Sequence, residues 1–494
     1  TAAIGDSKRD ENNQRETKHV VVEGAKKLDD EQRQEAPRAQ QHKLTHRGSD
    51  SALRLVWEAP APCNRAAGLG WTSALYFITL SFFARLCAMS IVTELDFLKY
   101  RRTKIVATIG PASADPAVIR ELINAGVGVF RINMSHGEHA AHRAAIAAIR
   151  ENAAQLEVHT AILADLCGPK IRTGKFAGGS IELEAGAEVM VTTRDVLGDT
   201  GVIPSQYESL PGDVAPGNRI LLNDGAVELE VLTVAGPDIA CRVVAGGPVG
   251  DHKGINLPGV NVSAPSLTEK DRTDAAFALA EDVDFIALSF VRSAADIQQL
   301  VEVVSGSEHP PMLIAKIEKP EALENNAEIL ALADGIMVAR GDLGVELSPE
   351  QVPIAQHQLI NLAIEANKPV IVATQMLESM IENARPTRAE VTDVSTAVAS
   401  GTDAVMLSGE TAVGRHPVRA VTMMDRVARQ TESYHWHPEA PARAEQTRRR
   451  RGTVAFGKAI ANAAASPVAD MGARAVLVTS NPGMTAAAIS TAQP

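Results

Sequence analysis

The stretches Leu313-Ile-Ala-Lys316-Ile-Glu318-Lys319-Pro320 and Met337-Val-Ala-Arg340-Gly341-Asp342-Leu-Gly344 carry most of the information about the fold. Each begins as a short apolar run and ends in charged residues, which is typical of a buried strand whose carboxyl end borders a site. One lysine and two carboxylates would then lie at the ends of consecutive strands. Two carboxylates can hold Mg²⁺ and leave positions for substrate oxygens, while an ammonium can neutralise a phosphoryl group in transfer. The pattern indicates chemistry on a phosphorylated, anionic substrate; the alternative is a solvated strand end.

The same succession of apolar strand, polar residue and amphipathic helix repeats from about Thr103 to Tyr434. Strands that alternate with helices in this way predict a (β/α)8 TIM barrel, an α/β fold whose working face lies at the carboxyl ends of the strands. The predicted strands are Ile105–Ile109, Val127–Asn133, Thr160–Asp165, Asp284–Phe290, Met312–Glu318, Gly335–Asp342, Pro369–Thr374 and Asp403–Ser408. The polar residues expected at the working face are Arg131, Asn133, Ser135, Asp165, Ser289, Lys316, Glu318, Asp342, Thr374, Ser408 and Glu410.

An insertion interrupts the repeat between the third and fourth strands. Two-residue alternation, as in Ile181-Glu-Leu-Glu, and turns such as Asn223-Asp224-Gly225 predict hairpins in a small all-β unit. We expect this insert at residues 171–264, between barrel segments 89–170 and 265–436, where it would overhang the barrel mouth as a lid that excludes water. Lys253 would lie near the return hinge. The alternative is a decorative domain with an exposed lysine.

Nine segments spread over about 330 residues follow the pattern of one known family, in the same order along the chain: Thr103 to Ser113, Phe130 to Gly137, Gly168 to Gly174, Lys253 to Gly259, Ala315 to Glu318, Met337 to Gly344, Ala373 to Met380, Pro386 to Glu390 and Met406 to Thr411. On these segments the chain resembles the pyruvate kinase family. The resemblance implies a glycolytic phosphotransferase that moves a phosphoryl group from phosphoenolpyruvate to ADP and gives pyruvate and ATP. It also implies a homotetramer in the cytoplasm.

The resemblance assigns a role to most of the polar strand ends. Glu318 and Asp342 would bind Mg²⁺ or Mn²⁺, and Lys316 would stabilise the transferring phosphoryl group. Arg131 would grip the substrate phosphate, for which a planar guanidinium is well suited. The expected substrate contacts are Arg131, Ser289, Lys316, Gly341, Asp342 and Thr374, and the expected nucleotide contacts are Asn133, His136, Arg172 and Lys253. The residues expected to order the group that protonates the enolate carbon are Thr374, Ser408 and Glu410.

Three of the polar residues have plain alternatives. His136 is either a nucleotide contact or a cap of the helix that follows Gly137, and Ser289 is either a substrate contact or a capping serine. Cys167 is expected to fill space at the barrel mouth rather than act as a nucleophile, because no base stands near it in the sequence.

Position 170 departs from the family pattern for a monovalent cation. Many pyruvate kinases need potassium and carry Thr-Lys-Gly-Pro-Glu after the aspartate that ends the third strand, whereas this chain has Asp165-Leu166-Cys167-Gly168-Pro169-Lys170. Asn133, Ser135 and Asp165 resemble the potassium ligands and are present. A tethered ammonium at position 170 can supply the charge that the ion brings, so K⁺ is expected not to be required. The alternative is that Lys170 points to solvent and the site still binds potassium.

Composition sets wider bounds. The 494 residues have a net charge of −12, which speaks against nucleic acid as the main partner. The four cysteines, Cys63, Cys87, Cys167 and Cys241, show no CxxC spacing, which argues against a disulfide framework or a zinc site and suits a reducing compartment.

Both ends of the chain differ from the family. Residues 1–88 are expected to be a disordered or non-native extension, although the uncharged run from Ala66 to Ala84 is near the length of a membrane span. Residues 437–452, with the run Arg448 to Arg451, are expected to form a linker. Residues 453–494 would form an incomplete, truncated C-terminal α/β domain, in which Asn481-Pro482 departs from the family pattern of a phosphate-holding loop.

Two other functions remain open from the sequence. A phosphoenolpyruvate or oxoacid lyase on a similar barrel would share the metal site and the arginine, but would need neither the lid nor the segment Pro386 to Glu390. A truncated, catalytically inactive or effector-blind scaffold is the non-enzymatic alternative.

Overall fold

The computed structural model describes residues 101–436 and short pieces at 459–461, 463–464, 476–478, 486 and 489–490. The predictions for residues 1–88 and for the linker 437–452 lie outside these residues, as does most of the predicted C-terminal domain. No helix within the described ranges is long and apolar enough to cross a membrane.

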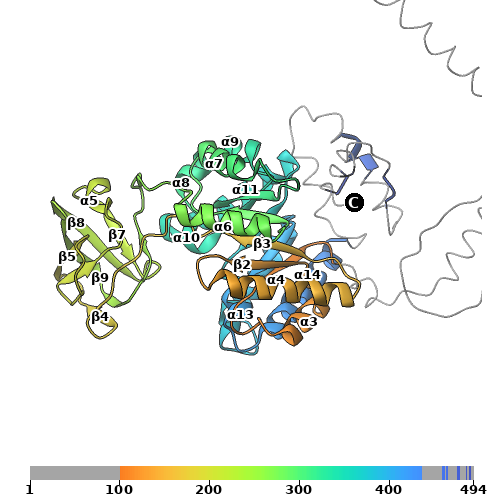
Figure 1. Cartoon of the computed structure of the whole chain (residues 1–494), viewed down its shortest axis with the longest axis horizontal. Coiled ribbons are helices and arrows are strands. Elements are labelled where there is room, and N and C mark those ends of the chain that lie inside the picture. Colours follow the sequence, from red (N-terminus) through yellow and green to blue (C-terminus); the bar gives the residue numbers. More distant parts are fainter. Residues whose placement is uncertain are drawn as a thin grey trace, which may run out of the picture. The chain divides into compact units, whose positions relative to one another are not determined.

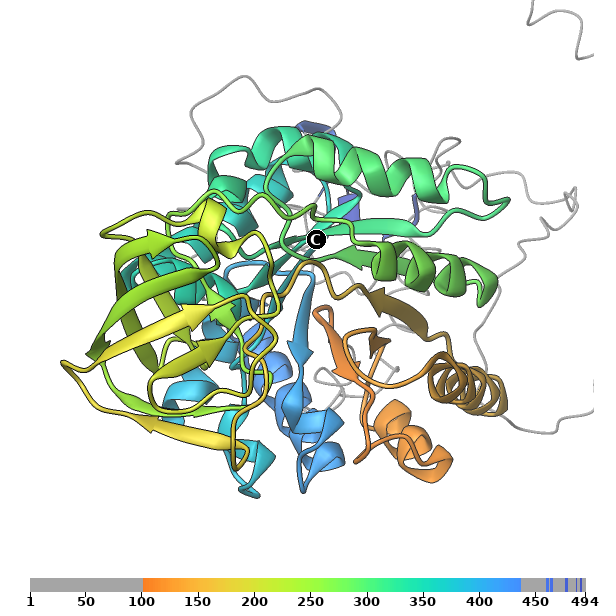
Figure 2. The ribbon, with the colours of Figure 1, turned by 60° about the vertical axis from the view of Figure 1, so that its left-hand side comes forward.

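Eight parallel strands close into a barrel, as the sequence predicted, in the order β1-β16-β15-β14-β13-β12-β3-β2. The first and last strands pair, with Ile105 opposite Val405. Figure 2 shows these strands in colours that run from orange to blue. The bounds are β1 Lys104–Thr108, β2 Val129–Asn133, β3 Ala161–Asp165, β12 Phe285–Leu288, β13 Met312–Ile317, β14 Gly335–Ala339, β15 Val370–Ala373 and β16 Ala404–Leu407.

The strands bury both faces, because helices pack around the outside of the barrel (Figure 1). Side chains such as Leu163, Ile314 and Met337 form a separate small cluster made only from barrel strands, as expected for the filled interior of such a barrel. The helices are α3 Pro116–Asn124, α4 His139–Gln155, α6 Glu269–Ala280, α7 Ala294–Val304, α8 Pro320–Glu324, α9 Asn326–Leu332, α10 Arg340–Glu346, α11 Val352–Ala366, α12 Arg388–Ala399, α13 Gly409–Ala412 and α14 Pro417–Trp436, with short 3-10 turns at η1 Pro349–Gln351 and η2 Glu378–Ile381.

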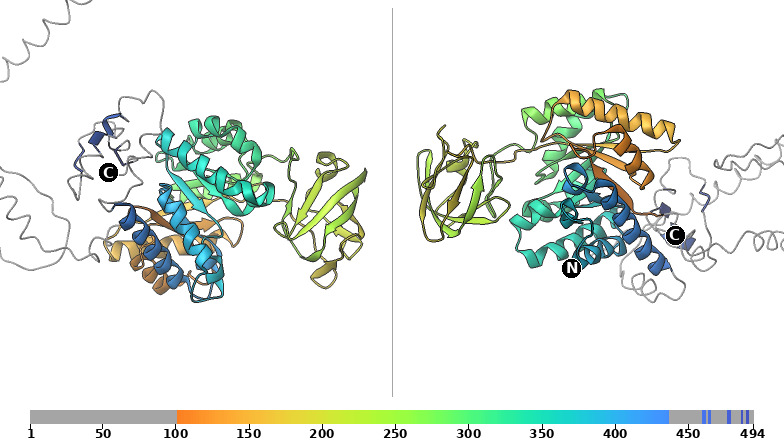
Figure 3. Two further views of the ribbon diagram at one scale, coloured as in Figure 1. Left: turned by 180° about the vertical axis from the view of Figure 1, so that it is seen from behind. Right: turned by 90° about the horizontal axis from the view of Figure 1, so that it is seen from below.

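The two ends of the barrel segment are tied together. The backbone N–H groups of Arg102 and Thr103 donate to the carboxylate of Glu432 in α14, at 2.9 and 2.8 Å. Figure 3 shows the orange helix α3 beside the blue helix α14. Closure of the barrel therefore depends on contacts between segments more than 300 residues apart.

Several strands end earlier than the sequence predicted. The predicted strand Gly335–Asp342 stops at Ala339, and Arg340 to Asp342 begin helix α10. A carboxylate in the first helical turn is favoured by the partial positive charge there. Phe290 and Thr374, predicted as strand ends, instead have φ of 54° and 66°. The chain turns sharply at both residues, so these side chains are aimed by loops and not by strand pleating.

The predicted insert forms a six-stranded sheet in the order β11-β7-β8-β9-β5-β6 and a two-stranded sheet of β10 and β4. Its apolar side chains, from Phe176 to Ala264, make a core separate from that of the barrel. Asn223, Asp224 and Gly225 all have positive φ in the predicted hairpin turn. The insert also has one helical turn, α5 Leu210–Asp213, which the all-β prediction lacked. The strands are β4 Ser180–Leu183, β5 Glu188–Thr192, β6 Val202–Pro204, β7 Arg219–Leu222, β8 Val227–Ala235, β9 Asp238–Ala245, β10 Gly247–Gly250 and β11 Ile255–Asn256.

Candidate active site

A cavity of about 110 Å³ lies at the carboxyl ends of the barrel strands. It contains two carboxylates and four side chains that carry permanent positive charge, a composition suited to a phosphorylated anion. The lining residues are Arg131, Asn133, Ser135, His136, Cys167, Lys170, Arg172, Ser289, Phe290, Lys316, Glu318 and Asp342. Most of them were predicted at the working face from the sequence.

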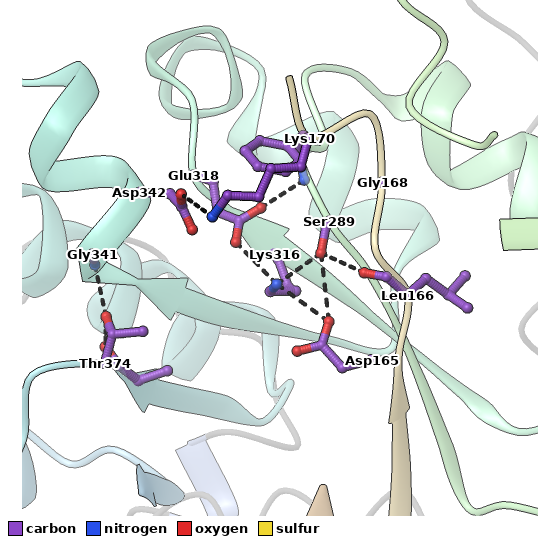
Figure 4. A network of polar contacts seen from close by, with 12 residues as sticks. Asp165, Leu166, Gly168, Lys170, Ser289, Lys316, Glu318, Gly341, Asp342 and Thr374 are labelled. Atoms are coloured by element: carbon purple, nitrogen blue, oxygen red, sulfur yellow. Dashed lines mark hydrogen bonds and ion pairs between the residues drawn. The ribbon is translucent and has the colours of Figure 1, made fainter. Parts of the chain in front are cut away.

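Lys316 is the centre of a buried polar network (Figure 4). Its Nζ lies 3.0 Å from Glu318 Oε1 and 3.2 Å from Asp165 Oδ1. It also donates to Ser289 Oγ at 2.7 Å. Residues two apart on a strand face the same side, so Lys316 shares a side of β13 with the interior residue Ile314. The lysine is thereby held at the top of the barrel interior.

Asp165 holds two cations at once. Its Oδ2 lies 2.6 Å from Arg131 Nε, while its Oδ1 faces Lys316. Burial by itself would raise the pKa of Asp165, but the charges of Arg131 and Lys316 outweigh burial and lower it. Asp165 is therefore ionised and fixes the positions of both cations.

Lys316 and Glu318 form an ion pair in which the pKa of both groups is raised. Burial alone would lower the pKa of Lys316, but Asp165 and Glu318 together raise it. The pKa of Glu318 is also raised, by burial and by the like charge of Asp342, against the opposing effect of Lys316. Lys316 has two carboxylate partners, whereas Glu318 has a carboxylate neighbour of its own. An additional cation between Glu318 and Asp342 would relieve this repulsion.

The two carboxylates fit a magnesium ion. Glu318 Oε2 accepts from the Phe290 N–H at 2.7 Å, so its Oε1 is the oxygen that faces Lys316. Asp342 is the more exposed carboxylate and contacts Lys170. Within the described ranges no group of three or more His, Cys, Asp or Glu side chains is placed to hold a metal. Mg²⁺ commonly keeps only one or two carboxylates and takes its other ligands from water and substrate phosphates, which this pair allows.

Lys170 faces the cavity rather than the solvent. Its Nζ lies 3.3 Å from Asp342 Oδ1, and its side chain is 27% exposed. Asn133 and Ser135 line the same cavity, and the Ser135 N–H donates a hydrogen bond to Asn133 Oδ1. The Leu166 carbonyl, predicted in the cation region, accepts from Ser289 Oγ at 2.7 Å. The structure thus contradicts the solvent-facing position of Lys170, while its replacement of potassium stays a prediction.

The residues predicted to handle the proton, Thr374, Ser408 and Glu410, do not line the cavity. Thr374 Oγ1 accepts from the Gly341 N–H at 2.6 Å, so the backbone amide of Gly341, one of the expected substrate contacts, already has a partner. Glu410 is buried and accepts from the N–H groups of Leu377 and Ser408, and burial raises its pKa. Ser408 Oγ is buried without a hydrogen-bond partner among the described residues.

The predicted nucleotide contacts are only partly brought together. Asn133, His136 and Arg172 line the cavity, whereas Lys253 does not. Burial, followed by the charges of Arg172 and Lys170, lowers the pKa of His136. The cap position of helix α4 falls on Glu138, so the interpretation of His136 as the helix cap is wrong.

Sequence reasoning missed the role of Arg340. Its buried guanidinium donates to the Thr374 carbonyl at 2.7 Å and to Asp393 at 2.7 Å. Thr374 and Gln375 both have positive φ, which is costly for a β-branched residue such as threonine. Arg340 thus holds a strained turn in place. A charged residue directly after an apolar strand was the available signal.

Together, the barrel and this cavity define an enzyme class: a (β/α)8-barrel protein with a carboxylate pair and cations arranged for a phosphorylated substrate. The family model of the pyruvate kinase barrel domain matches residues 100–421. The chain belongs to the pyruvate kinase family.

Individual relatives agree with that assignment. A pyruvate kinase of Mycobacterium intracellulare is 49% identical over 356 residues, which cover 72% of this chain and 75% of the relative. Pyruvate kinase 2 of a Synechocystis species is 45% identical over 80% of this chain and 66% of its own. A crystal structure of a pyruvate kinase from Cryptosporidium parvum superposes with a TM-score of 0.73 at 40% identity, over 81% of this chain and 82% of that one. These comparisons favour pyruvate kinase over the lyase and scaffold alternatives.

Proposed function

We propose that this chain transfers the phosphoryl group of phosphoenolpyruvate to ADP and so forms pyruvate and ATP, the phosphotransferase step that ends glycolysis. The observation that carries this proposal is the position of Lys316 between Asp165, Glu318 and Ser289, beside Arg131 in one cavity. A fixed cation placed where charge develops lowers the barrier of phosphoryl transfer. Phosphoenolpyruvate, ADP and ATP are all phosphorylated anions, so positive charge in the cavity favours the binding of each.

Arg131 and Lys316 bind the substrate phosphate in this proposal. Asp165 contacts both side chains, so the guanidinium and the ammonium keep their spacing when the substrate arrives. Ser289 is a further substrate contact, because its hydroxyl links Lys316 to the backbone of β3. Pre-arranged donors of this kind need little reorganisation during the reaction.

Glu318 and Asp342 would hold Mg²⁺ or Mn²⁺. Bound there, the ion would supply positive charge that neutralises the substrate oxygens. Glu318 is kept in orientation by the Phe290 N–H, and Asp342 by the start of helix α10. Both carboxylates are therefore aimed by backbone elements and not by flexible loops alone.

Thr374, Ser408 and Glu410 would manage the second half of the reaction. Loss of the phosphoryl group leaves the enolate of pyruvate, whose methylene carbon must gain one proton to give pyruvate. Thr374 is held by Gly341 and by Arg340, while the Ser408 hydroxyl is buried without a hydrogen-bond partner among the described residues and would hold the proton-delivering water in this proposal. Glu410 fixes the backbone around both, so its contribution is to position the proton donor.

Asn133, His136 and Arg172 are the proposed contacts of the ADP phosphates, since they line the cavity beside Lys170. Lys253 joins them in this proposal only after a change in the position of the insert, because it lies outside the cavity lining. Lid movement of this type is common in phosphoryl-transfer enzymes. Cytoplasmic location and a homotetrameric assembly, which the resemblance implies, remain predictions.

Lys170 is proposed to replace the potassium ion. Its ammonium already neutralises Asp342, so near-full activity is expected in buffer free of sodium and potassium with a bulky organic cation. Lys170→Glu should create a potassium requirement, whereas Lys175→Glu, at an exposed site in the insert, should not. Initial rates against KCl concentration test both variants. Tenfold or greater activation of the parent protein by potassium would contradict this role.

A lactate dehydrogenase-coupled assay tests the overall proposal. Purified protein with phosphoenolpyruvate and Mg²⁺ should form pyruvate only when ADP is added, with ATP in equal amount. Pyruvate formation without ADP would favour a lyase or a hydrolase. Absence of pyruvate under every condition would favour the inactive scaffold.

A further inference from the structure

Three buried polar side chains meet at the root of the insert. Glu346 Oε1 accepts from Lys319 Nζ at 2.6 Å and from Asn256 Nδ2 at 3.2 Å. All three residues are less than 10% exposed. Asn256 belongs to β11 of the insert, whereas Lys319 and Glu346 belong to the barrel.

The two barrel members are close in sequence to the proposed metal carboxylates. Lys319 directly follows Glu318, and Glu346 lies one helical turn after Asp342 on α10. Residues four apart on a helix share a face, and both residues belong to the short helix α10, so a displacement of this helix moves Glu346 and Asp342 together. The ion pair between Lys319 and Glu346 thus braces the segments that present Glu318 and Asp342.

The insert meets the same helix at a second point. A Cβ placed on Gly225, in the hairpin turn between β7 and β8, would lie 3.6 Å from the Val345 side chain. Val345 precedes Glu346 on α10. β11 pairs with β7, so both contacts come from one edge of the six-stranded sheet. Among the described residues, the insert thus approaches helix α10 at two points, through the Asn256–Glu346 hydrogen bond and through Gly225 beside Val345.

Stability alone does not account for this cluster. The free energy lost when two charges leave water is about as large as the attraction gained between them, and an apolar replacement of similar volume is often neutral or stabilising. Glu346 Oε2 is also buried without a hydrogen-bond partner in the part of the chain that the structure describes, which adds to the cost. A costly polar cluster is better explained by the geometry that it imposes.

We propose that Lys319, Glu346 and Asn256 are positioning residues that fix the distance between Glu318 and Asp342 and make it depend on the placement of the insert. This inference rests on the proposed metal role of the two carboxylates. Cation affinity would then be coupled to lid position through one shared carboxylate oxygen. Outer contacts of metal ligands commonly change metal affinity by about 10–100-fold.

Titration of Mn²⁺ without substrates, followed by the EPR signal of the free ion, tests this proposal independently of turnover. The double variant Lys319→Met, Glu346→Leu removes the pair without leaving a buried lone charge, and it should weaken Mn²⁺ binding about tenfold. Asn256→Ala should weaken it about threefold in the parent. In the double variant the same change should have no further effect, because the oxygen that Asn256 contacts is gone.

Asp403→Asn is the matched control. Asp403 is a carboxylate that accepts from the Val370 N–H at 2.9 Å, just before the amino end of β16 and therefore on the opposite side of the barrel from the cavity. This variant should lose stability without a change in Mn²⁺ affinity. A shift equal to that of the cluster variants would mean that general destabilisation explains the result and would overturn the proposal.

The remaining outcomes are equally decisive. A folded double variant whose Mn²⁺ curve overlays that of the parent would refute the bracing role, and an unchanged Asn256→Ala curve would refute the link to the insert. Should the double variant not fold, Glu346→Gln, which keeps the shape of the side chain, takes its place with the same expectation. Parent protein that binds Mn²⁺ but makes no ATP would contradict the proposed function and leave these comparisons valid.

Discussion

Lys316 shows how one buried cation is made compatible with a barrel interior. Three oxygen atoms, from Asp165, Glu318 and Ser289, surround its ammonium within 3.2 Å. A buried lysine without such partners would lose its charge. Here the carboxylates keep the group ionised, which suits the proposed electrostatic role of Lys316 and does not suit a role as a base.

Replacement of this lysine should affect the chemical step. Lys316→Met is expected to lower kcat by about 10²–10³-fold with little change in the KM of phosphoenolpyruvate, because the ammonium acts mainly on the transition state. Steady-state kinetics on a variant shown by circular dichroism to be folded provides the measurement. Lys104→Met, the same change at an exposed position at the amino end of β1, serves as the control. Unchanged turnover would remove Lys316 from the mechanism.

The lowered pKa of Asp165 predicts how the stability of the fold depends on pH. Because its pKa is lowered in the folded state, its ionised form stabilises the fold above the ordinary aspartate value of 3.8, and this stabilisation is lost as pH falls through the lowered value. Asp165→Asn leaves Arg131 without its carboxylate partner and should cost about 3–5 kcal/mol at pH 7.

Urea unfolding at several pH values measures this difference. The gap in unfolding free energy between the parent and Asp165→Asn should be constant from pH 7 to about 5 and narrow only below about pH 4. Narrowing already between pH 7 and 5 would show that another group causes it.

At the scale of elements, turns complete the site after the strands have brought it together. β15 ends at Ala373, and the next two residues have positive φ. The turn is held from α10 by Arg340 and from α13 by Glu410, whose carboxylate binds the Leu377 N–H. Loops that are anchored in this way can keep a strained geometry that the strand alone would not impose.

Glu410 should therefore act first on the stability of this turn. In Glu410→Gln, one amide oxygen cannot replace two carboxylate oxygens that accept from Leu377 and Ser408, so a loss of about 1–3 kcal/mol is expected. Thermal and urea unfolding give the measurement. Glu382→Gln, in an exposed pair with Arg415, should change stability by less than about 1 kcal/mol. Equal losses in the two variants would contradict the anchoring role of Glu410.

At the scale of the whole molecule, the barrel and the insert have separate apolar cores. The insert core is made of short strands. The insert meets the barrel at the hydrogen bond between Asn256 and Glu346 and at the cavity, which Lys170 and Arg172 line. Separate cores allow one part to open without the other. A lid needs this independence in order to move.

Hydrogen exchange can detect that independence. Leu229, fully buried in β8, contributes to the insert core, and Leu229→Ala should cost about 2–5 kcal/mol there. Mass spectrometry should show faster exchange in strands β5, β7, β8 and β9, with little change in the barrel strands. Equal loss of protection in β13 and β14 would mean that the two cores unfold together.

The sequence by itself determined the barrel, its eight strands and the interruption by hairpins. These features follow from local periodicity, because a strand buried on both faces is a continuous apolar run and a hairpin alternates. It also placed Arg131, Asp165 and Lys316 at one face, since parallel strands in a barrel present their carboxyl ends together. Asp342 was placed there correctly even though the residue lies on a helix and not on a strand.

Only the tertiary structure decided which of these side chains contact one another. Asn256 and Lys319 both donate to Glu346 Oε1. Lys253 lies outside the cavity, although its sequence motif predicted a nucleotide contact. Such contacts depend on turns with positive φ and on packing between segments far apart in the chain, and neither leaves a periodic trace in the sequence. Local pattern therefore fixed which side chains reach the mouth of the barrel, while the distances between them came from long-range packing.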